Sequence, residues 1–260
     1  MSVEQYNTTL EPLRVIVVGS GNVAEAMACA LATAPGVELC QIYSRNRERG
    51  EAIARRAGVA WTGCLDELAS ADIYLIAVSD RAVGEVAASL PLSEDAIVAH
   101  TAGSVPLSVL PKREGRGIMY PLQSFSAGRT ISLADVPLFV EADGERARTL
   151  LMRLASMLSS RVEYADSERR RVLHLAGVLV NNFVNALYAE GASVVESAGL
   201  DFDILRPLIM ETARKAVDSD NPRSVQTGPA SRGDMEVCRG HMAMLESQPQ
   251  LQQIYKDIKV

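Results

Sequence analysis

Through residue 143, short apolar runs alternate with segments of helical periodicity. The runs at 14–18 and 72–78 are almost continuously apolar, and helix-like segments such as 22–34 separate them. Near-continuous apolar strands separated by helices are typical of a parallel sheet that is covered on both faces. The pattern therefore predicts an α/β domain. Its expected strands are 14–18, 37–43, 59–62, 72–78, 96–99, 117–120 and 137–141, and its expected helices are 22–34, 45–57, 65–68 and 82–90.

The pattern changes after Asp143. One more helix at 145–158 and one short strand at 161–164 follow, and beyond them the apolar positions recur with helical spacing. We therefore predict two domains, a parallel-sheet domain over residues 1–155 and an all-helical domain over residues 156–260. The expected helices of the second domain are 167–197, 202–217, 231–247 and 249–257.

Composition and charge are those of a globular protein and exclude several classes of function. Of the 260 residues, 48% are hydrophobic and 22% are charged, and the net charge is −6. A mildly acidic chain without basic tracts argues against nucleic acid as a partner. The four cysteines are scattered, so we expect neither disulfides nor a metal site. The chain shows no secretory signal, and its longest apolar stretch, 175–189, is broken by three asparagines, so we expect a cytoplasmic protein without a membrane partner.

A glycine-rich turn carries the first specific motif. Residues 19–24, with the sequence GSGNVA, follow an apolar strand directly and open a helix, and they fit the pattern G-x-G-x-x-G/A. In such a turn the first glycine permits the tight bend, the second lets the backbone approach a pyrophosphate, and the helix N-terminus holds the negative charge. The alternative is a turn without a ligand. The context predicts a Rossmann-type dinucleotide site, in which the cofactor contacts Gly19, Ser20, Gly21, Asn22 and Val23.

The end of the second expected strand indicates which dinucleotide is bound. An NAD site usually carries Asp or Glu there, about 20 residues after the glycines, to bind the ribose hydroxyls. This chain has Ser44 and Arg45 at that strand end and no acid. Arginine can bind a phosphate through two hydrogen bonds, so NADP is favoured over NAD. The alternative is an exposed, charged start of a helix.

Two further strand ends complete the expected rim of the site. Ligands of open parallel sheets lie outside the carboxyl ends of the strands, so both segments point toward the nicotinamide half of a bound cofactor. Asp80 can instead act as a helix N-cap, and His100 can instead be a hydrogen-bonded structural histidine. The candidate contacts are Val78, Ser79 and Asp80 at one end and His100, Thr101, Ala102 and Gly103 at the other.

Seven segments together carry a resemblance that covers nearly the whole chain. They are GSGNVAEAMA, VSD, HTAGSVPLSVL, MYPLQSF, LHLAGVLVNNFVNALY, LIMETARKA and QTGPASRGD. With them the chain resembles a bacterial family of Rossmann-like proteins that are described as NADP-dependent oxidoreductases without an established substrate, and whose C-terminal half is a domain of unknown function. More distantly it is similar to pyrroline-5-carboxylate reductase and to the 3-hydroxyisobutyrate and 6-phosphogluconate dehydrogenases. The resemblance implies a helical domain that mediates dimerisation, and hence a homodimer.

A polar stripe runs along the expected helix 167–197. At about 100° per residue, His174, Asn181 and Asn185 lie on one face of an otherwise apolar helix, and Asn182 lies on its shoulder. Polar side chains in such a setting require hydrogen-bonding partners. The stripe is therefore predicted to be either a substrate-binding face opposite the nicotinamide or a hydrogen-bond network between helices or subunits.

The resemblance also implies a lysine that this chain lacks. Related hydroxyacid dehydrogenases use a Lys four residues before an Asn on the corresponding helix as acid and base, but the residues four before Asn181 and Asn182 are Gly177 and Val178. This departure argues against a simple hydroxyacid dehydrogenase. A histidine can transfer protons near neutral pH. We therefore assign the proton-donor role to His174 and catalytic positioning of the substrate to Asn181 and Asn182.

Four further residues are candidates for substrate binding, together with Asn185. Tyr120 and Gln123 follow a strand and can line a substrate cleft, or their loop can simply tie the domains together. Lys215 is spaced for a surface ion pair with Glu211, although both fall in a segment that carries the resemblance. Arg232 lies near a helix start, where backbone amides and a guanidinium suit an anionic group. Capping of that helix is the alternative.

These observations predict an oxidoreductase that uses NADP to reduce a C=O or C=N group of a small polar or anionic substrate. A function of another class is a dinucleotide-binding sensor or interaction protein that retains the fold without catalysis, which the missing lysine also fits. A third interpretation is a dehydrogenase of the prephenate or arogenate type, since such enzymes combine these two domain types and use a histidine. Oxidation of bound NADPH by an oxo acid or a cyclic imine distinguishes an enzyme from a sensor.

Overall fold

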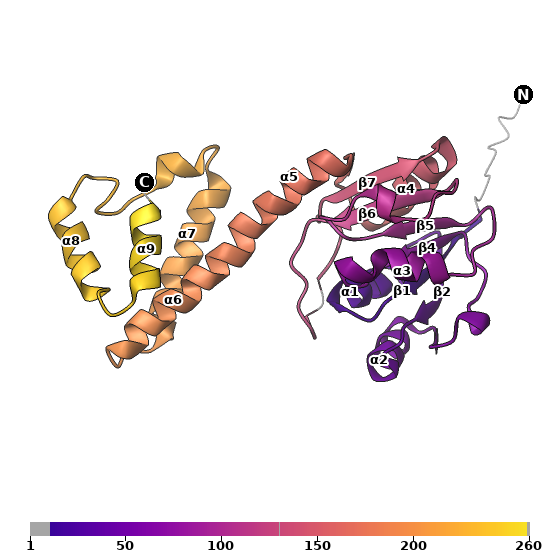
Figure 1. Cartoon of the computed structure of the whole chain (residues 1–260), viewed down its shortest axis with the longest axis horizontal. Helices are drawn as coiled ribbons and strands as arrows, with labels where there is room; N and C mark the ends of the chain where they lie inside the picture. The colour runs from indigo at the N-terminus through magenta and orange to yellow at the C-terminus, as the bar shows by residue number, and fades with distance from the viewer. Residues whose placement is uncertain (1–10, 130, 259–260) are drawn as a thin grey trace, which may run out of the picture. The chain divides into compact units, whose positions relative to one another are not determined.

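The computed structural model describes residues 11–129 and 131–258. The chain divides into two compact units, Met1–Asn181 and Asn182–Val260. The first unit contains every strand of the described chain and the second is helical, which confirms the expected fold class. Figure 1 shows the elements of both units along the chain.

The first unit is built on one eight-stranded sheet with the strand order β3-β2-β1-β4-β5-β6-β7-β8. Neighbouring strands are parallel except for β6 and β7. The first five positions, with the order reversing between β1 and β4, are those of a doubly wound nucleotide-binding sheet. The strands are β1 (Leu13–Val18), β2 (Val37–Tyr43), β3 (Ala60–Thr62), β4 (Ile73–Ile76), β5 (Ile97–His100), β6 (Arg116–Pro121), β7 (Leu138–Asp143) and β8 (Val162–Tyr164).

The antiparallel pair β6–β7 departs from the parallel sheet that the sequence predicts. Parallel neighbours need a crossover connection, usually a helix. The connection from Pro121 to Leu138 contains no helix in its described residues, 122–129 and 131–137. The chain therefore returns beside β6 in the opposite direction, and Tyr120 pairs with Phe139.

Helices cover both faces of this sheet (Figure 1). On one face, the helices α1, α2 and α4 bury apolar side chains against alternate strand residues, and on the other face α3 does the same. Met27 and Leu31 of α1 are fully buried, and burial of such a side chain stabilises the fold by ~1.5–3 kcal/mol. These helices are α1 (Asn22–Leu31), α2 (Arg47–Ala57), α3 (Val83–Ser89) and α4 (Glu145–Leu158). The short helices η1 (Leu65–Glu67), η2 (Asp80–Ala82) and η3 (Leu107–Val109) lie in connections between strands.

A continuous helix of 31 residues then runs from Ser167 to Ser197. It comprises α5 (Ser167–Gly177), a π-helical turn η4 (Val178–Phe183) and α6 (Val184–Ser197). By length and composition alone this helix is apolar enough to cross a membrane. However, α5 buries Arg170 completely and packs Leu173 against β6 and β7, so its beginning is part of the sheet domain.

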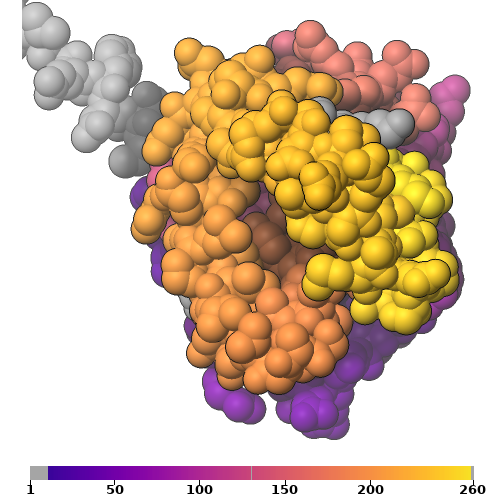
Figure 2. Space-filling model, turned by 90° about the vertical axis from the view of Figure 1, so that its left-hand side faces the viewer, coloured from indigo at the N-terminus to yellow at the C-terminus, as the bar shows by residue number. Residues whose placement is uncertain are grey.

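The second unit has little core of its own. Its helices after α6 are η5 (Phe202–Leu205), α7 (Arg206–Asp218), η6 (Pro222–Val225), α8 (Met235–Met244) and α9 (Pro249–Asp257). Among its described residues, Leu245 is the single buried hydrophobic side chain. A space-filling view shows a hollow between the orange segment, which includes α6 and α7, and the yellow segment, which includes α8 and α9 (Figure 2).

Candidate active site

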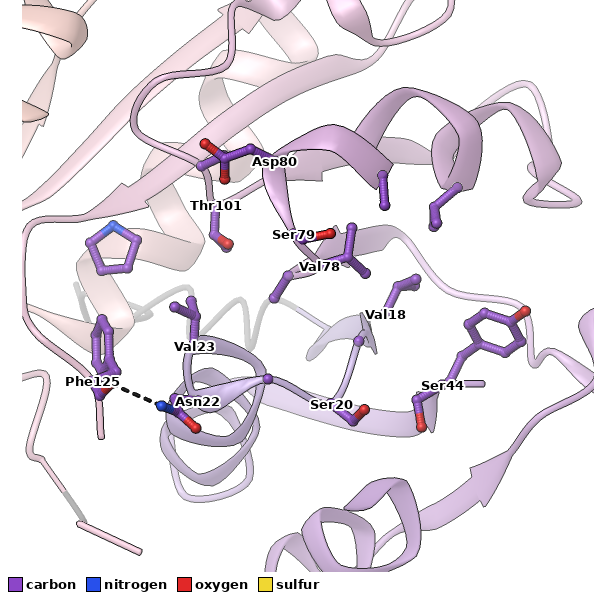
Figure 3. A pocket seen from close by; sticks show the side chains of 18 of the residues that line it. Val18, Ser20, Asn22, Val23, Ser44, Val78, Ser79, Asp80, Thr101 and Phe125 are labelled. Carbon is purple, nitrogen blue, oxygen red and sulfur yellow. Dashed lines mark hydrogen bonds between the residues drawn. The ribbon is translucent and has the colours of Figure 1, made fainter. Parts of the chain in front are cut away.

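A pocket of about 750 Å³ lies at the carboxyl edge of the sheet, above the ends of β1, β2, β4 and β5. This is the edge at which the strand order reverses, where open α/β sheets bind their ligands. In Figure 3, Asp80 and Thr101 lie toward one end of the pocket and Ser44 toward the other. Sixteen of the residues predicted from the sequence line it: Gly19, Ser20, Gly21, Asn22, Val23, Ser44, Arg45, Val78, Ser79, Asp80, Thr101, Ala102, Gly103, Tyr120, Gln123 and His174.

The two glycines of the glycine-rich turn are required for different reasons. Gly19 has a φ of 138°, and a Cβ there would lie 2.2 Å from the carbonyl oxygen of Ala77. The fold itself therefore needs this glycine. Gly21 has an ordinary extended backbone, with φ −78° and ψ 179°, and a Cβ there would meet no other described atom within 4 Å. Neither conformation nor packing explains Gly21, whereas close approach of a ligand to the backbone does.

The start of α1 is suited to an anion. Gly21 is its N-cap residue and supplies no side-chain cap, so the first amides of the helix face the pocket without a side-chain acceptor in the described chain. Such amides, together with the helix dipole, favour phosphate groups. The residues present therefore fit the pyrophosphate of a dinucleotide.

At the end of β2, Ser44 and Arg45 have different environments. The Ser44 hydroxyl is buried, accepts a hydrogen bond from Trp61 Nε1 at 3.1 Å and donates one to the carbonyl oxygen of Asn46 at 2.9 Å. Arg45 is exposed and lines the pocket. At this strand end, the Arg45 guanidinium is thus the group that is accessible to a ligand. The Ser44 hydroxyl stabilises the turn from which Arg45 projects.

The loop after β6 is tied to the glycine-rich turn. Asn22 Nδ2 donates a hydrogen bond to the carbonyl oxygen of Phe125 at 3.1 Å, and Arg49 donates one to Asn22 Oδ1 at 3.1 Å. Figure 3 shows the Asn22 side chain pointing to Phe125 beside the pocket. Phe125 also lines the pocket, which was not predicted from the sequence, although this residue ends the segment YPLQSF on which the family resemblance partly rests.

A tyrosine and a histidine meet at the end of the pocket where Asp80 and Thr101 lie. The Tyr120 hydroxyl lies 3.3 Å from His174 Nδ1, and the two rings meet edge to face with centroids 6.1 Å apart. Burial raises the pKa of Tyr120 above its ordinary value of 10, so its hydroxyl keeps its proton at neutral pH. Close by, the Ser104 hydroxyl donates a hydrogen bond to the Asp80 carboxylate. This end of the pocket can therefore both donate and accept protons.

His100 lies beneath the rim, apart from the described residues that line the pocket. It is fully buried, and its Nδ1 accepts a hydrogen bond from the Ala102 amide at 3.2 Å. Burial, reinforced by the nearby charge of Arg170, lowers its pKa to about 4. The neutral ring therefore braces the backbone that carries Thr101 and Gly103.

A buried ion pair that was not predicted from the sequence fixes α5 on the sheet. Arg170 pairs with Glu141 of β7 and donates a hydrogen bond to the carbonyl oxygen of Val105 at 2.6 Å. The Ser167 hydroxyl lies 2.9–3.0 Å from both Glu141 carboxylate oxygens. The sequence contains one indication of this pair: Arg170 precedes His174 by four residues and so lies on the same helix face. Because three arginines follow one another there, the sequence does not show which of them is buried.

The remaining predicted residues lie farther along the chain. Asn181 ends the first unit inside the π-helical turn, and Asn182 and Asn185 begin the second. Lys215 of α7 lies 3.8 Å from Glu211 in an exposed ion pair, and Arg232 lies in the turn that precedes α8. Short π-helical turns are frequent at functional sites, and the role of Asn181 and Asn182 in substrate positioning stays a prediction.

Comparisons with known proteins agree with this site. Residues 14–103 match the family described as NADP oxidoreductase, coenzyme F420-dependent, and residues 136–259 match a domain of unknown function, DUF2520. A solved structure from Bacteroides fragilis, the protein BF3122 assigned as an NADP oxidoreductase, is 36% identical, covers 95% of this chain and 96% of its own, and has a TM-score of 0.85. No curated protein matches the chain.

More distant structures share the fold alone. Prephenate dehydrogenase from Aquifex aeolicus is 18% identical over 94% of this chain and 97% of its own, with a TM-score of 0.56. A pyrroline-5-carboxylate reductase from Coxiella burnetii is 15% identical over 96% of this chain and 100% of its own, with a TM-score of 0.57. Together with the glycine-rich turn and the pocket above it, the comparisons show that the chain is an oxidoreductase with a nicotinamide dinucleotide cofactor, and that it belongs to the NADP oxidoreductase family in which this Rossmann-type domain precedes the DUF2520 domain.

Proposed function

We propose that the protein uses NADP to reduce a C=O or C=N group of a small polar or anionic substrate. The observation that carries this proposal is a single pocket that extends from the glycine-rich turn and Arg45 to the Tyr120–His174 pair. The bound dinucleotide supplies the hydride. The chain supplies the phosphate-binding amides near Gly21 and, at the opposite end, a proton for the substrate.

The preference for NADP over NAD rests on Arg45. An exposed guanidinium at the end of β2, on the lining of the pocket, suits a 2′-phosphate, which arginine binds through charge-assisted hydrogen bonds. The strand end carries no carboxylate that would hold the two free hydroxyls of an NAD ribose.

Residues of the helical part are proposed to take part in substrate binding. In this proposal Asn181, Asn182 and Asn185 orient the substrate, and Lys215 or Arg232 binds its anionic group. His174 is the source of the proton, in place of the lysine of related dehydrogenases.

We test the cofactor by titrating the protein with NADPH and NADH while following the fluorescence of Trp61, the single tryptophan of the chain. The Trp61 indole is hydrogen-bonded to Ser44, next to Arg45, so binding at this strand end changes its surroundings. Replacing Arg45 with Ala should weaken NADPH binding by about 10- to 100-fold, the equivalent of ~1.5–3 kcal/mol for hydrogen bonds to a charged group. NADH binding should change little.

Arg55→Ala is the matched control, because Arg55 is an exposed arginine in the last turn of α2 and is not a lining residue. It should leave the affinity for both dinucleotides unchanged. Equal binding of NADPH by the wild type and by Arg45→Ala would refute the role of Arg45. Absence of binding of either dinucleotide to the wild type would refute the proposed function as a whole.

A dinucleotide-binding sensor remains the second candidate, because Gly177 and Val178 occupy the positions where related dehydrogenases carry a catalytic lysine. The discriminating measurement is the absorbance of NADPH in the presence of oxo acids and cyclic imines. Tight binding without oxidation by any of them would favour the sensor.

We further propose that the protein is a cytoplasmic homodimer that pairs through its helical part. The helix from Ser167 to Ser197 exposes large apolar side chains, and the second unit buries almost none among its described residues. A second copy of the chain is therefore the expected cover for them. Light scattering should give twice the chain mass, and Val180→Glu should yield monomers. A monomeric wild type would refute the pairing. The exposed side chains are Val172, Leu175, Leu179, Val180, Phe183 and Leu187.

A further inference from the structure

The contact between Tyr120 and His174 suggests how the proton reaches the substrate. Tyr120 comes from the end of β6 and His174 from α5, and both line the pocket. The hydroxyl of the tyrosine faces Nδ1 of the histidine at 3.3 Å. Resting on the proposed function, we infer that Tyr120 is the catalytic residue that donates the proton to the substrate, and that His174 resupplies that proton to the tyrosine.

The position of Tyr120 suits a terminal donor. It lies at the carboxyl edge of the sheet, where the substrate must meet the nicotinamide. Tyr120 is 9% exposed and lines the pocket. A phenol can donate one hydrogen bond and accept another at the same time. It can therefore hold the substrate heteroatom while its oxygen stays in contact with His174.

Charged groups from three elements face this pair. Asp80 of η2 and Arg170, one turn before His174 on α5, act on Tyr120 with opposite sign. Glu141 of β7 neutralises Arg170. Burial remains the largest influence on Tyr120 and raises its pKa. The hydroxyl is thus protonated at the start of the reaction, as a donor must be.

A glycine of the rim makes room for the contact. A Cβ on Gly103 would lie 2.7 Å from Tyr120 Cζ and 2.8 Å from His174 Nδ1. Both distances are shorter than those of real Cβ contacts, so with any other residue one or both rings would have to move. His100, at the end of β5 behind this backbone, is buried and neutral and so adds no charge to the pair. Gly103 is therefore a positioning residue for the two rings.

The proposed step balances in atoms and charge. The substrate carbon accepts a hydride from the reduced nicotinamide, which is thereby oxidised, and the C=O or C=N double bond becomes a single bond. The substrate heteroatom takes the hydroxyl proton of Tyr120. The phenol oxygen then takes the Nδ1 proton of His174 while the imidazole takes a proton from solvent water, so the charge of the ring is the same before and after the reaction.

The chain offers a matched control for this pair. In the second unit, the Tyr255 hydroxyl lies 2.7 Å from His241 Nδ1 in a similar edge-to-face contact. Tyr255→Phe therefore removes a hydroxyl from a Tyr–His pair that has no part in the proposed step. Because the chain has three histidines, imidazole NMR signals can be assigned with single substitutions.

The experiment measures NADPH oxidation by glyoxylate, pyruvate and 1-pyrroline for the wild type, Tyr120→Phe, Tyr255→Phe and His174→Gln, from pH 5 to 9. We expect Tyr120→Phe to lower kcat by about 100-fold with KM little changed, as for loss of a general acid. His174→Gln should lower kcat and alter its pH profile, because Tyr120 then lacks the partner that returns its proton. Tyr255→Phe should match the wild type. The His174 NMR signals should shift in Tyr120→Phe and stay unchanged in Tyr255→Phe.

Three outcomes overturn the inference, and they can be told apart. Unimpaired turnover in Tyr120→Phe refutes the donor role of Tyr120 and leaves the proposed function standing. No turnover of any of the three probes by the wild type refutes the proposed function and the inference with it, even if the NMR shifts show that the two side chains touch. A large loss of kcat in Tyr255→Phe would also refute the inference, because the effect would then not be specific to the pocket.

Discussion

The buried pair of Arg170 and Glu141 makes a strong prediction about stability. The Arg170 side chain is 1% exposed and that of Glu141 is 11% exposed. The Ser167 hydroxyl bridges to the same carboxylate, and the carbonyl oxygen of Val105 accepts a further bond from Arg170. Replacing Glu141 with Gln preserves the shape of this cluster and removes its negative charge. The guanidinium is then left buried without a counter-ion.

The size of the effect follows from that burial. Removing one partner of a buried ion pair destabilises a protein by ~3–5 kcal/mol. The side-chain carbonyl of the introduced glutamine would still accept one hydrogen bond, so the lower limit of about 3 kcal/mol applies. For a chain of this size each kcal/mol shifts Tm by ~2–4 °C. Glu141→Gln should therefore lower Tm by about 6–12 °C.

The assay is thermal unfolding followed by circular dichroism, with Asp143→Asn as the control. Asp143 lies two residues farther along β7 and pairs with Arg116 at 2.7 Å, but its side chain is 51% exposed. A pair with one side chain in solvent is screened by water and contributes ~0–1 kcal/mol, so Tm should fall by no more than about 4 °C. Equal shifts of Tm in the two variants would refute the argument, because the loss of stability would then depend on ion pairing as such and not on burial.

Three further variants test the rim of the pocket. In a thermal-shift assay, Gly21→Ala should abolish the stabilisation that the dinucleotide gives and leave Tm of the free protein unchanged. Gly19→Ala should lower Tm of the free protein itself, because its Cβ would clash with the Ala77 carbonyl oxygen. The pKa of His100 is about 4 in the folded protein, against an ordinary value of 6.5. Between these values the unfolded state binds a proton that the folded state does not, so the free energy of unfolding falls as the pH drops from 6.5 to 4, by ~3 kcal/mol in total. Urea unfolding at pH 7 and pH 4.5 should show that His100→Gln loses most of this dependence; an unchanged dependence would show that another group causes it.

The sequence by itself determined the fold class and one half of the site. Apolar strands alternating with helices predicted the sheet, and the GSGNVA turn placed Gly19 and Gly21 correctly at the carboxyl end of β1. These features are local, because each depends on residues that are close along the chain: a strand, a turn and the helix that follows. Such short-range patterns are what periodicity and glycine spacing report.

The tertiary structure decided which side chains meet. The contact of Tyr120 with His174 joins residues 54 positions apart, and the pair of Glu141 and Arg170 joins residues 29 apart. Both contacts depend on where α5 packs against β6 and β7. The strand β7 is antiparallel to β6, because no crossover helix lies in the described part of the connection between them. One arginine among three neighbours is buried because it alone faces a carboxylate on the sheet. No local pattern encodes that choice, because it is made by packing between elements that the chain brings together only when it folds.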